Sequence, residues 1–316
     1  MAANLGAPIA KWPRLSLAEW DDTRATLHLW TQIVGKFRLA QAPLINHWWQ
    51  VPLYVSARGL TTSAIPCEGH SLQIEFDFID HQLRIETSRG GRERIALRPC
   101  SVAEFYREIM GRLRKLGVTM RIWSMPVELE NPVPFEKDEA HASYDGEQAQ
   151  RFWRALVQVD RVLTVFRARF VGKVSPVHFF WGSFDMAVTR FSGRTAPPHP
   201  GAPNVADFVT REAYSHECSS CGFWPGAGMG EAAFYSYAYP APDGFERATV
   251  RPAAACFHPE LSEFILPYEA VRQAKDPDRE LLEFLQSTYE AAADLGRWDR
   301  AALERAPRSI LGEAMS

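Results

Sequence analysis

Histidine and glutamate residues beside aromatic side chains are the first candidates for chemistry in this sequence. His216 and Glu217 are adjacent, and such a pair can act as acid and base near neutral pH, or as metal ligand and base. Neighbouring residues of a regular strand point to opposite faces, so joint action requires a bulge or loop. The following Ser219, Ser220 and Gly222 favour such an irregularity. The alternative is a hydrogen-bonded pair at a sheet edge.

Sulfur and imidazole ligands for zinc occur in two short clusters. They are His216, Cys218 and Cys221 in the first, and Cys256 and His258 in the second. Residues at odd separation on a strand face opposite sides of the sheet, which argues against a shared ion. We therefore predict that Cys218 and Cys221 share neither a disulfide nor a four-ligand zinc site. The sequence leaves open whether any metal or cofactor is bound.

An aromatic segment at residues 177–191 is expected to form one strand. On such a strand Trp181 and Asp185 share one face, while His178 and Arg190 share the other. Burial among phenylalanines would raise the pKa of the Asp185 carboxyl unless a cation is paired with it. Asp185 is therefore either a functional acid or half of a structural ion pair.

Two segments of the chain have similar residue spacing, 49–58 and 181–190, and suggest an internal duplication. The alternative is a chance coincidence of two helix-then-strand passages. Arg58 and Arg190 end the two segments, and together they could clamp a carboxylate or phosphate. Otherwise they are exposed strand ends. His47 contacts a ligand in one interpretation and donates to a backbone carbonyl of the core in the other.

These patterns assign each candidate residue a role. The candidate catalytic residues are His216, Glu217, His178 and Asp185, and the candidate ligand-binding residues are His47, Trp49, Arg58, Trp181 and Arg190.

The elements that must position these residues follow one order twice, which predicts an α+β fold. Capping patterns begin helices at Ser16, Ser101, Asp145 and Asp276. Alternating apolar residues predict strands at 72–78, 83–88 and 94–97, with further strands at 47–58 and 118–124. In the second half, strands are expected within 213–223, 232–239 and 263–266.

We predict two tandem, degenerate repeats of helix, four-stranded antiparallel sheet and helix, packed about a pseudo-twofold axis. The first module covers residues 1–130, a Pro-rich linker covers 131–146, the second module covers 147–300, and a tail covers 301–316. A cavity between the two sheets would be lined by both halves.

Three motifs resemble a bacterial family known as a domain of unknown function. They are Asn-His-Trp-Trp at 46–49, Val-His-Phe-Phe-Trp-Gly-Ser-Phe-Asp at 177–185, and Tyr-Ser-His-Glu at 214–217 with Gly-Phe-Trp-Pro-Gly at 222–226. The resemblance extends from about Trp12 to Trp298 and implies no activity. Members of that family tend to carry apolar or small residues where Cys218 and Cys221 stand, which implies that a thiol pair is not essential.

Composition limits the class of protein. The 316 residues are 46% hydrophobic and 23% charged, with a formal net charge of −3, so we expect a folded protein without a nucleic-acid partner. No apolar run reaches the ~20 residues of a membrane span, and the start of the chain lacks a signal-peptide core. Five cysteines are typical of a reducing compartment, which predicts a cytoplasmic location. The oligomeric state stays open.

Three functions agree with these observations. The first is an enzyme acting on a small molecule, with a His/Glu acid–base or metal site in an aromatic cavity between the halves. The second is a noncatalytic protein that binds a small ligand in the same cavity. The third is an interaction protein whose aromatic surface meets a partner.

Overall fold

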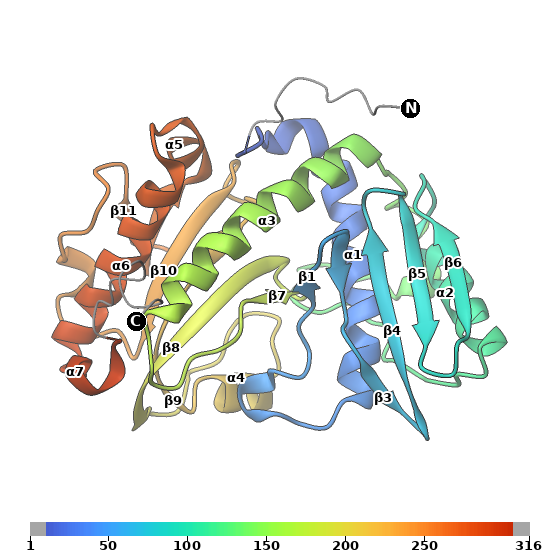
Figure 1. Ribbon diagram of the computed structural model, residues 1–316, viewed down its shortest axis with the longest axis horizontal. Helices are drawn as coiled ribbons and strands as arrows, with labels where there is room; N and C mark the ends of the chain where they lie inside the picture. Colours follow the sequence, from blue (N-terminus) through green and yellow to red (C-terminus); the bar gives the residue numbers. More distant parts are fainter. Residues whose placement is uncertain (1–10, 306–316) are drawn as a thin grey trace, which may run out of the picture.

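Two antiparallel sheets form the framework of the computed structural model, which describes residues 11–305 (Figure 1). The first sheet has the strand order β1-β2-β4-β5-β6. Strand β3 pairs with the first residues of β4, whereas β2 pairs with its last residues. Its strands are β1 (Tyr54–Val55), β2 (Gly59–Thr61), β3 (Ile65–Cys67), β4 (His70–Asp77), β5 (Gln82–Thr87) and β6 (Arg92–Ala96). The α+β class is confirmed, but this sheet has six strands where we expected four.

The second sheet also has six strands, in the order β11-β12-β10-β9-β8-β7. They are β7 (His178–Phe180), β8 (Asp185–Thr195), β9 (His216–Trp224), β10 (Ala233–Tyr239), β11 (Cys256–His258) and β12 (Glu263–Pro267). The sheets meet at their edges, where Leu53 and Phe179 exchange two backbone hydrogen bonds of 2.9 Å. This bridge fixes the first half against the second.

Helix α1 (Leu17–Gln41) runs through the middle of the molecule (Figure 1). It begins after Ser16 as predicted, although the Ser16 side chain makes no capping hydrogen bond. Every residue from 26 to 38 is buried, because sheet 1 and α2 (Val102–Lys115) lie on one side and the second half lies on the other. The helix therefore carries buried polar residues that a surface helix would expose.

Helices α3 (Gly146–Ala168) and α6 (Pro277–Leu295) cover one face of the second sheet. The Asp145 carboxylate caps α3 by accepting from the Gln148 N–H at 3.0 Å, as predicted. The opposite face lies toward α4 (Asp207–Ala213) and the short helix η1 (Asn46–Trp48). The remaining helices are η2 (Phe135–Lys137), η3 (Phe245–Arg247), α5 (Tyr268–Gln273) and α7 (Arg300–Leu303).

Several predicted elements differ from the observed ones. Residues 177–191 are not one strand but a hairpin of β7 and β8, whose turn includes Phe184 in the left-handed region at φ 60°. Residues 118–124 form no strand, and residues 47–58 begin in η1 instead of a strand. The expected linker, 131–146, contains η2 and buries Phe135 against the core.

Each half contains a long helix, six strands and a further helix, but α4 interrupts the strands of the second half and the predicted residue alignment is wrong. Trp49 precedes β1, whereas Trp181 follows β7, so the two segments occupy different places in their sheets. One hydrophobic core contains residues of both halves. Duplication and the module boundaries stay predictions. The expected tail begins within α7, and residues 306–316 lie outside the described residues.

No helix within residues 11–305 combines the length and apolar character needed to cross a membrane.

Candidate functional site

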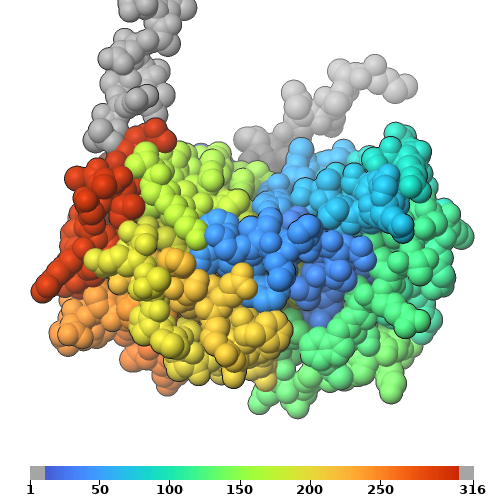
Figure 2. Space-filling view, turned by 90° about the horizontal axis from the view of Figure 1, so that it is seen from below, coloured from blue at the N-terminus to red at the C-terminus, as the bar shows by residue number. Residues whose placement is uncertain are grey.

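A cavity of about 490 Å³ lies between the two halves, on the face of the second sheet that α3 and α6 leave uncovered. Figure 2 shows this side of the molecule, where the blue segment containing η1 borders the yellow segment containing α4. Four of the predicted residues line the cavity: His47, Trp49, Trp181 and Asp185. The expectation that both halves would line it is confirmed.

Strand alternation builds the floor of the cavity from three neighbouring strands. Alternate residues of β8, β9 and β10 point into it, and they are Asp185, Ala187, Thr189, Phe191, Cys218, Ser220, Tyr235 and Tyr237. Hydroxyl groups in this floor bond to one another, with Thr189 and Ser220 2.9 Å apart and Tyr237 2.9 Å from the Tyr214 hydroxyl. The floor is therefore a hydrogen-bonded polar layer beneath aromatic walls.

Asp185 stands at the start of β8 and is 8% exposed. The Ser183 hydroxyl donates to one carboxylate oxygen at 2.5 Å, and the Tyr235 hydroxyl donates to the other. Burial nevertheless raises the pKa of the Asp185 carboxyl above its ordinary value, because no Lys or Arg in the described part of the chain is paired with it. Of the two predicted alternatives, the structural ion pair is wrong.

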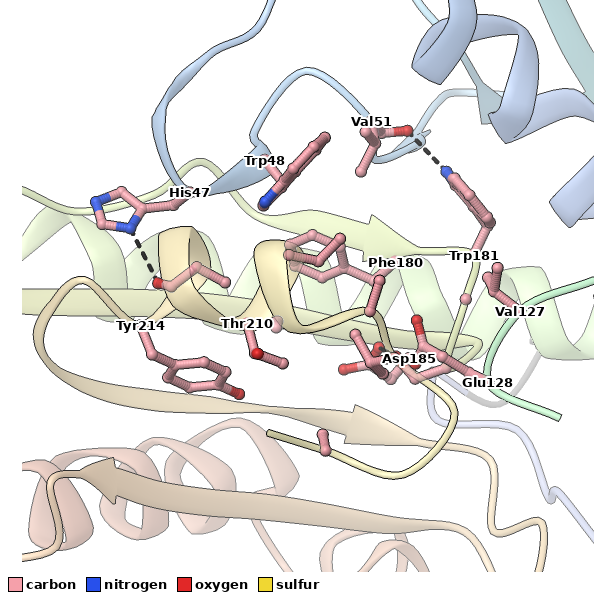
Figure 3. Close-up of a pocket in the computed structure, with 18 of the residues that line it drawn as sticks. His47, Trp48, Val51, Val127, Glu128, Phe180, Trp181, Asp185, Thr210 and Tyr214 are labelled. Atoms are coloured by element: carbon pink, nitrogen blue, oxygen red, sulfur yellow. Dashed lines mark hydrogen bonds between the residues drawn. The ribbon is translucent and has the colours of Figure 1, made fainter. Parts of the chain in front are cut away.

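Glu128 is the neighbouring acid, and it comes from the irregular segment before η2. Figure 3 shows its carboxyl group beside that of Asp185. The residue as a whole is exposed to solvent, while its carboxyl group lines the cavity and packs against the Gly182 backbone. Burial, and then the charge of Asp185, raise its pKa to about 7, while the Ser183 hydroxyl opposes the shift. Glu128 therefore titrates where a general acid or base is most effective.

Two glycines make room for these acids. At Gly182 an added Cβ would lie 2.0 Å from the Glu128 carboxylate, so the carboxyl group sits directly on the backbone of the β7–β8 turn. At Gly222 on β9 an added Cβ would lie 2.5 Å from the Tyr235 hydroxyl and 2.1 Å from the Met186 carbonyl oxygen. Gly222 thus lets the Tyr235 ring cross β9 and reach Asp185.

Substituting Gly222→Ala should lower the free energy of unfolding by about 1–3 kcal/mol, because the new methyl group cannot avoid the Met186 carbonyl. Urea denaturation measures the change. Gly111→Ala in α2 is the matched control, since the nearest atom to its added Cβ is 4.0 Å away and alanine favours a helix by about 1 kcal/mol. Equal stability of Gly222→Ala and the wild type would contradict the close approach.

Aromatic rings form the cavity walls. Phe180 and Trp181 come from the β7–β8 hairpin, and Trp48 packs against Phe208 of α4 at 5.6 Å between ring centroids. The Trp181 indole donates to the Val51 carbonyl at 2.8 Å, as Figure 3 shows, so only its ring remains for a ligand. The walls suit a largely apolar molecule.

Both ring nitrogens of His47 form hydrogen bonds within the protein. Its Nδ1 donates to the Ala213 carbonyl at 2.9 Å, and the Lys173 ammonium donates to its Nε2 at 2.6 Å. Burial, together with nearby Lys173 and His216, lowers its pKa and keeps the ring neutral. His47 and Trp48 both adopt positive φ, 59° and 62°, a strained turn that these contacts hold against α4. His47 therefore fits the predicted alternative of a histidine that donates to a carbonyl.

Five predicted site residues do not line the cavity. His178 is buried among Trp49, Tyr54 and Phe180, and burial lowers its pKa to about 3. Arg58 pairs with the carboxylates of Asp77 and Asp80, each at 2.6 Å.

Arg190 also lies outside the cavity, on the other face of the sheet. Its guanidinium stacks on Phe166 of α3 and Tyr289 of α6, 3.5 and 4.3 Å from the ring centroids. Arg58 and Arg190 therefore have separate partner sets, and the predicted anion clamp is wrong.

His216 and Glu217 separate as strand geometry requires. The His216 ring contacts the Ser215 hydroxyl at 3.0 Å, while Glu217 pairs with Arg194 at 2.6 Å. The irregularity between Phe191 and Thr195 on the neighbouring β8 does not bring them together, and neither lines the cavity, so the expected acid–base pair there is wrong. The cysteines diverge in the same way: Cys218 lines the cavity, and the Cys221 thiol faces the Val188 carbonyl at 3.7 Å.

Burial raises the pKa of both thiols to about 12, which disfavours the thiolates that bind metal. Within residues 11–305 no group of three His, Cys, Asp or Glu side chains is arranged to hold a metal ion.

Lys36 and Glu128 were missed by sequence reasoning. Lys36 lies three residues after Ile33 on the apolar stripe of α1, and a cation on such a stripe was an available signal. Glu128 lies in an irregular Pro-rich segment and gives no comparable signal. The Gln32 side chain fixes that segment by bonding both the N–H and the carbonyl of Val127 at 2.9 Å.

Comparison with known proteins gives a family but no activity. Residues 12–305 match a family described as a family of unknown function, DUF5996. No curated protein and no solved structure matches the chain. The match includes both halves and every residue that lines the cavity. The chain therefore belongs to DUF5996, a family of unknown function.

Proposed function

We propose that the protein is an enzyme that holds a small, largely apolar molecule in the cavity and exchanges a proton with it through Glu128. One observation carries the proposal: two carboxyl groups lie side by side in an aromatic cavity, without a cationic partner in the described residues. Uncompensated acids are costly to bury and are typical of functional sites. Glu128 and Asp185 take the role that the sequence suggested for His216 and Glu217.

The two acids have different tasks in this proposal. Glu128, with its pKa near 7, takes a proton from the bound molecule and returns it. Asp185 accepts hydrogen bonds from Ser183 and Tyr235, and its charge adds to the burial that raises the pKa of Glu128. The aromatic walls exclude water from the ligand and hold it over the floor.

The test is a screen of small aromatic and heteroaromatic compounds by thermal shift, followed by product analysis of those that bind. Turnover should rise as pH increases through about 7, because the base must be ionised. Glu128→Gln should reduce turnover by about 10²–10⁴-fold and leave binding in place. Glu260→Gln, at an exposed position between β11 and β12, is the matched control and should change neither.

Three other results of this screen would change the proposal. Binding of compounds without any turnover supports the noncatalytic ligand-binding alternative. Full turnover in Glu128→Gln would overturn the assigned role of that residue. Absence of any ligand from the cavity would favour a partner-binding role instead.

The same proposal includes a cytoplasmic location and an origin of the two halves by duplication. The location is supported by the free thiols of all five cysteines, each within the described residues. The duplication is supported by the presence in each half of a long helix, a six-stranded antiparallel sheet and a further helix.

A further inference from the structure

Lys36 is a buried lysine whose ammonium has no hydrogen-bond partner among the residues that the structure describes. Its side chain is 1% exposed, and no carboxylate of residues 11–305 lies within 4 Å of Nζ. Three aromatic rings surround the nitrogen: Trp123 at 4.7 Å, and Phe135 and Trp181 each at 5.9 Å from their centroids. These rings stabilise a cation, but they are not ordinary hydrogen-bond acceptors for the three N–H groups of the ammonium.

The neighbouring polar residues of α1 are all satisfied. Gln32 bonds the Val127 backbone in both directions, and Arg38 donates to the Gln50 carbonyl at 2.7 Å. Lys36 therefore differs from these two neighbours, although the indole nitrogens of Trp20 and Trp30 on the same helix also lack partners among the described residues. A buried ammonium without hydrogen bonds is costly, and a structural role alone would be served as well by methionine or leucine.

Lys36 also lines the same cavity as the acid pair. Its nitrogen lies over the Trp181 ring. The next residue, Gly182, carries the Glu128 carboxylate against its backbone, and Ser183 then bonds Asp185. Three consecutive residues, 181–183, thus contact an amine and two carboxyl groups that line one cavity.

We propose that Lys36 is the residue through which the cavity takes a carbonyl compound, by forming an imine with a small aldehyde or ketone. This inference rests on the proposed function, in which the cavity holds a small molecule. The Nζ lone pair adds to the carbonyl carbon, and the carbonyl oxygen takes a proton from Glu128. The resulting carbinolamine then loses its hydroxyl group, protonated by an acid, as one water molecule. The product is the imine of Lys36, and the amine protons return to the carboxylate and solvent.

The environment favours this step over simple binding of an anion. Burial lowers the pKa of Lys36 to about 8, so roughly a tenth of the amine is neutral and nucleophilic at pH 7. Asp185 and Glu128 make the cavity acidic, which disfavours a ligand carboxylate. The Trp123 ring, whose centroid is 4.7 Å from the nitrogen, is 68% exposed, so an exposed side chain separates the amine from solvent on that side.

The experiment uses the full chain with benzaldehyde as probe and sodium cyanoborohydride to reduce any imine, followed by peptide mapping. We expect a benzyl group on Lys36, attached at least ten times faster than on the exposed Lys137. Lys36→Arg should remove that fast label. Labelling of Lys36 no faster than that of Lys137 would overturn the inference, provided that circular dichroism shows wild-type and variant folded alike.

A second measurement separates this inference from the proposed function. Benzyl alcohol has the same ring but no carbonyl group, so it tests occupancy of the cavity without an imine. If benzyl alcohol raises the melting temperature and slows labelling, cavity binding holds; if it binds but Lys36 is never labelled, only the imine is overturned. If neither compound binds and no label forms, both proposals fail for aromatic ligands of this size.

Discussion

Replacing Lys36 with methionine is expected to raise the free energy of unfolding at neutral pH by about 3 kcal/mol. Methionine fills a similar volume with a flexible apolar chain and removes the unpartnered ammonium. Burial lowers the Lys36 pKa from 10.5 to about 8, so between these values the unfolded chain binds more protons than the folded one. Wild-type stability therefore rises with pH across this window, and the advantage of the variant closes as pH approaches 10.5.

Urea denaturation at pH 7 and pH 10 measures this difference. Lys137→Met, at an exposed position of η2, is the matched control and should change stability by no more than about 0.5 kcal/mol at either pH. If Lys36→Met raised the free energy of unfolding equally at both pH values, the buried ammonium would not be the cause of the increase. A loss of stability at pH 7 would show that its contacts with the aromatic rings outweigh its desolvation.

A stabilising substitution at a buried position indicates why the native residue is present. Lys36, Glu128 and Asp185 each carry a charge that their surroundings disfavour, and all three line one cavity. Residues that lower stability in this way are typical of sites selected for activity. Elsewhere in the protein, the buried carboxylate of Asp77 pairs with Arg58, and the Arg190 guanidinium donates to the Phe166 carbonyl and stacks on aromatic rings. The cavity is therefore the region where stability and the expected function conflict.

Local sequence signals predicted much of the framework. The capping serine Ser101 does accept from the Glu104 N–H, and the alternating apolar residues of 72–78 and 83–88 do form neighbouring strands. The hairpin at 181–184 could not be predicted from its residues, because Phe184 takes a positive φ that glycine or asparagine usually signals. Strands of three residues, such as β3 and β11, are too short for a period to be recognised.

The candidate site was only partly predictable for a similar reason. Asp185 and Trp181 were found because a carboxylate within an aromatic run is unusual in any fold. Glu128 becomes significant only through its contact with the Gly182 backbone, which lies more than fifty residues away in the chain. The predicted joint role of His216 and Glu217 required a local irregularity in their strand, and strand alternation separates the two side chains instead.

Asp185→Asn is expected to stabilise the protein at neutral pH, within the roughly 1–3 kcal/mol that an uncompensated buried polar group costs. Asparagine keeps an oxygen that accepts from Tyr235 and removes the buried charge. Burial raises the pKa of Asp185 above 3.8, so the folded state binds more protons than the unfolded chain above that pH. The wild type therefore loses stability as pH rises from about 3.8 through the folded pKa, and the variant does not.

Asp77→Asn is the matched control with the opposite sign. Asp77 is fully buried like Asp185, but the Arg58 guanidinium and the backbone N–H groups of Ile79 and Asp80 hold its pKa below 3.8 despite burial. Its charge stabilises the folded state above pH 3.8, and that contribution disappears as pH falls through the folded pKa. Asp77→Asn should therefore destabilise at pH 7 and approach the wild type in acid. Thermal melts from pH 3.5 to 8 compare the two. If Asp185→Asn destabilised the protein at pH 7 as Asp77→Asn does, then Asp185 would be a structural carboxylate and the acid pair would lose its assigned role.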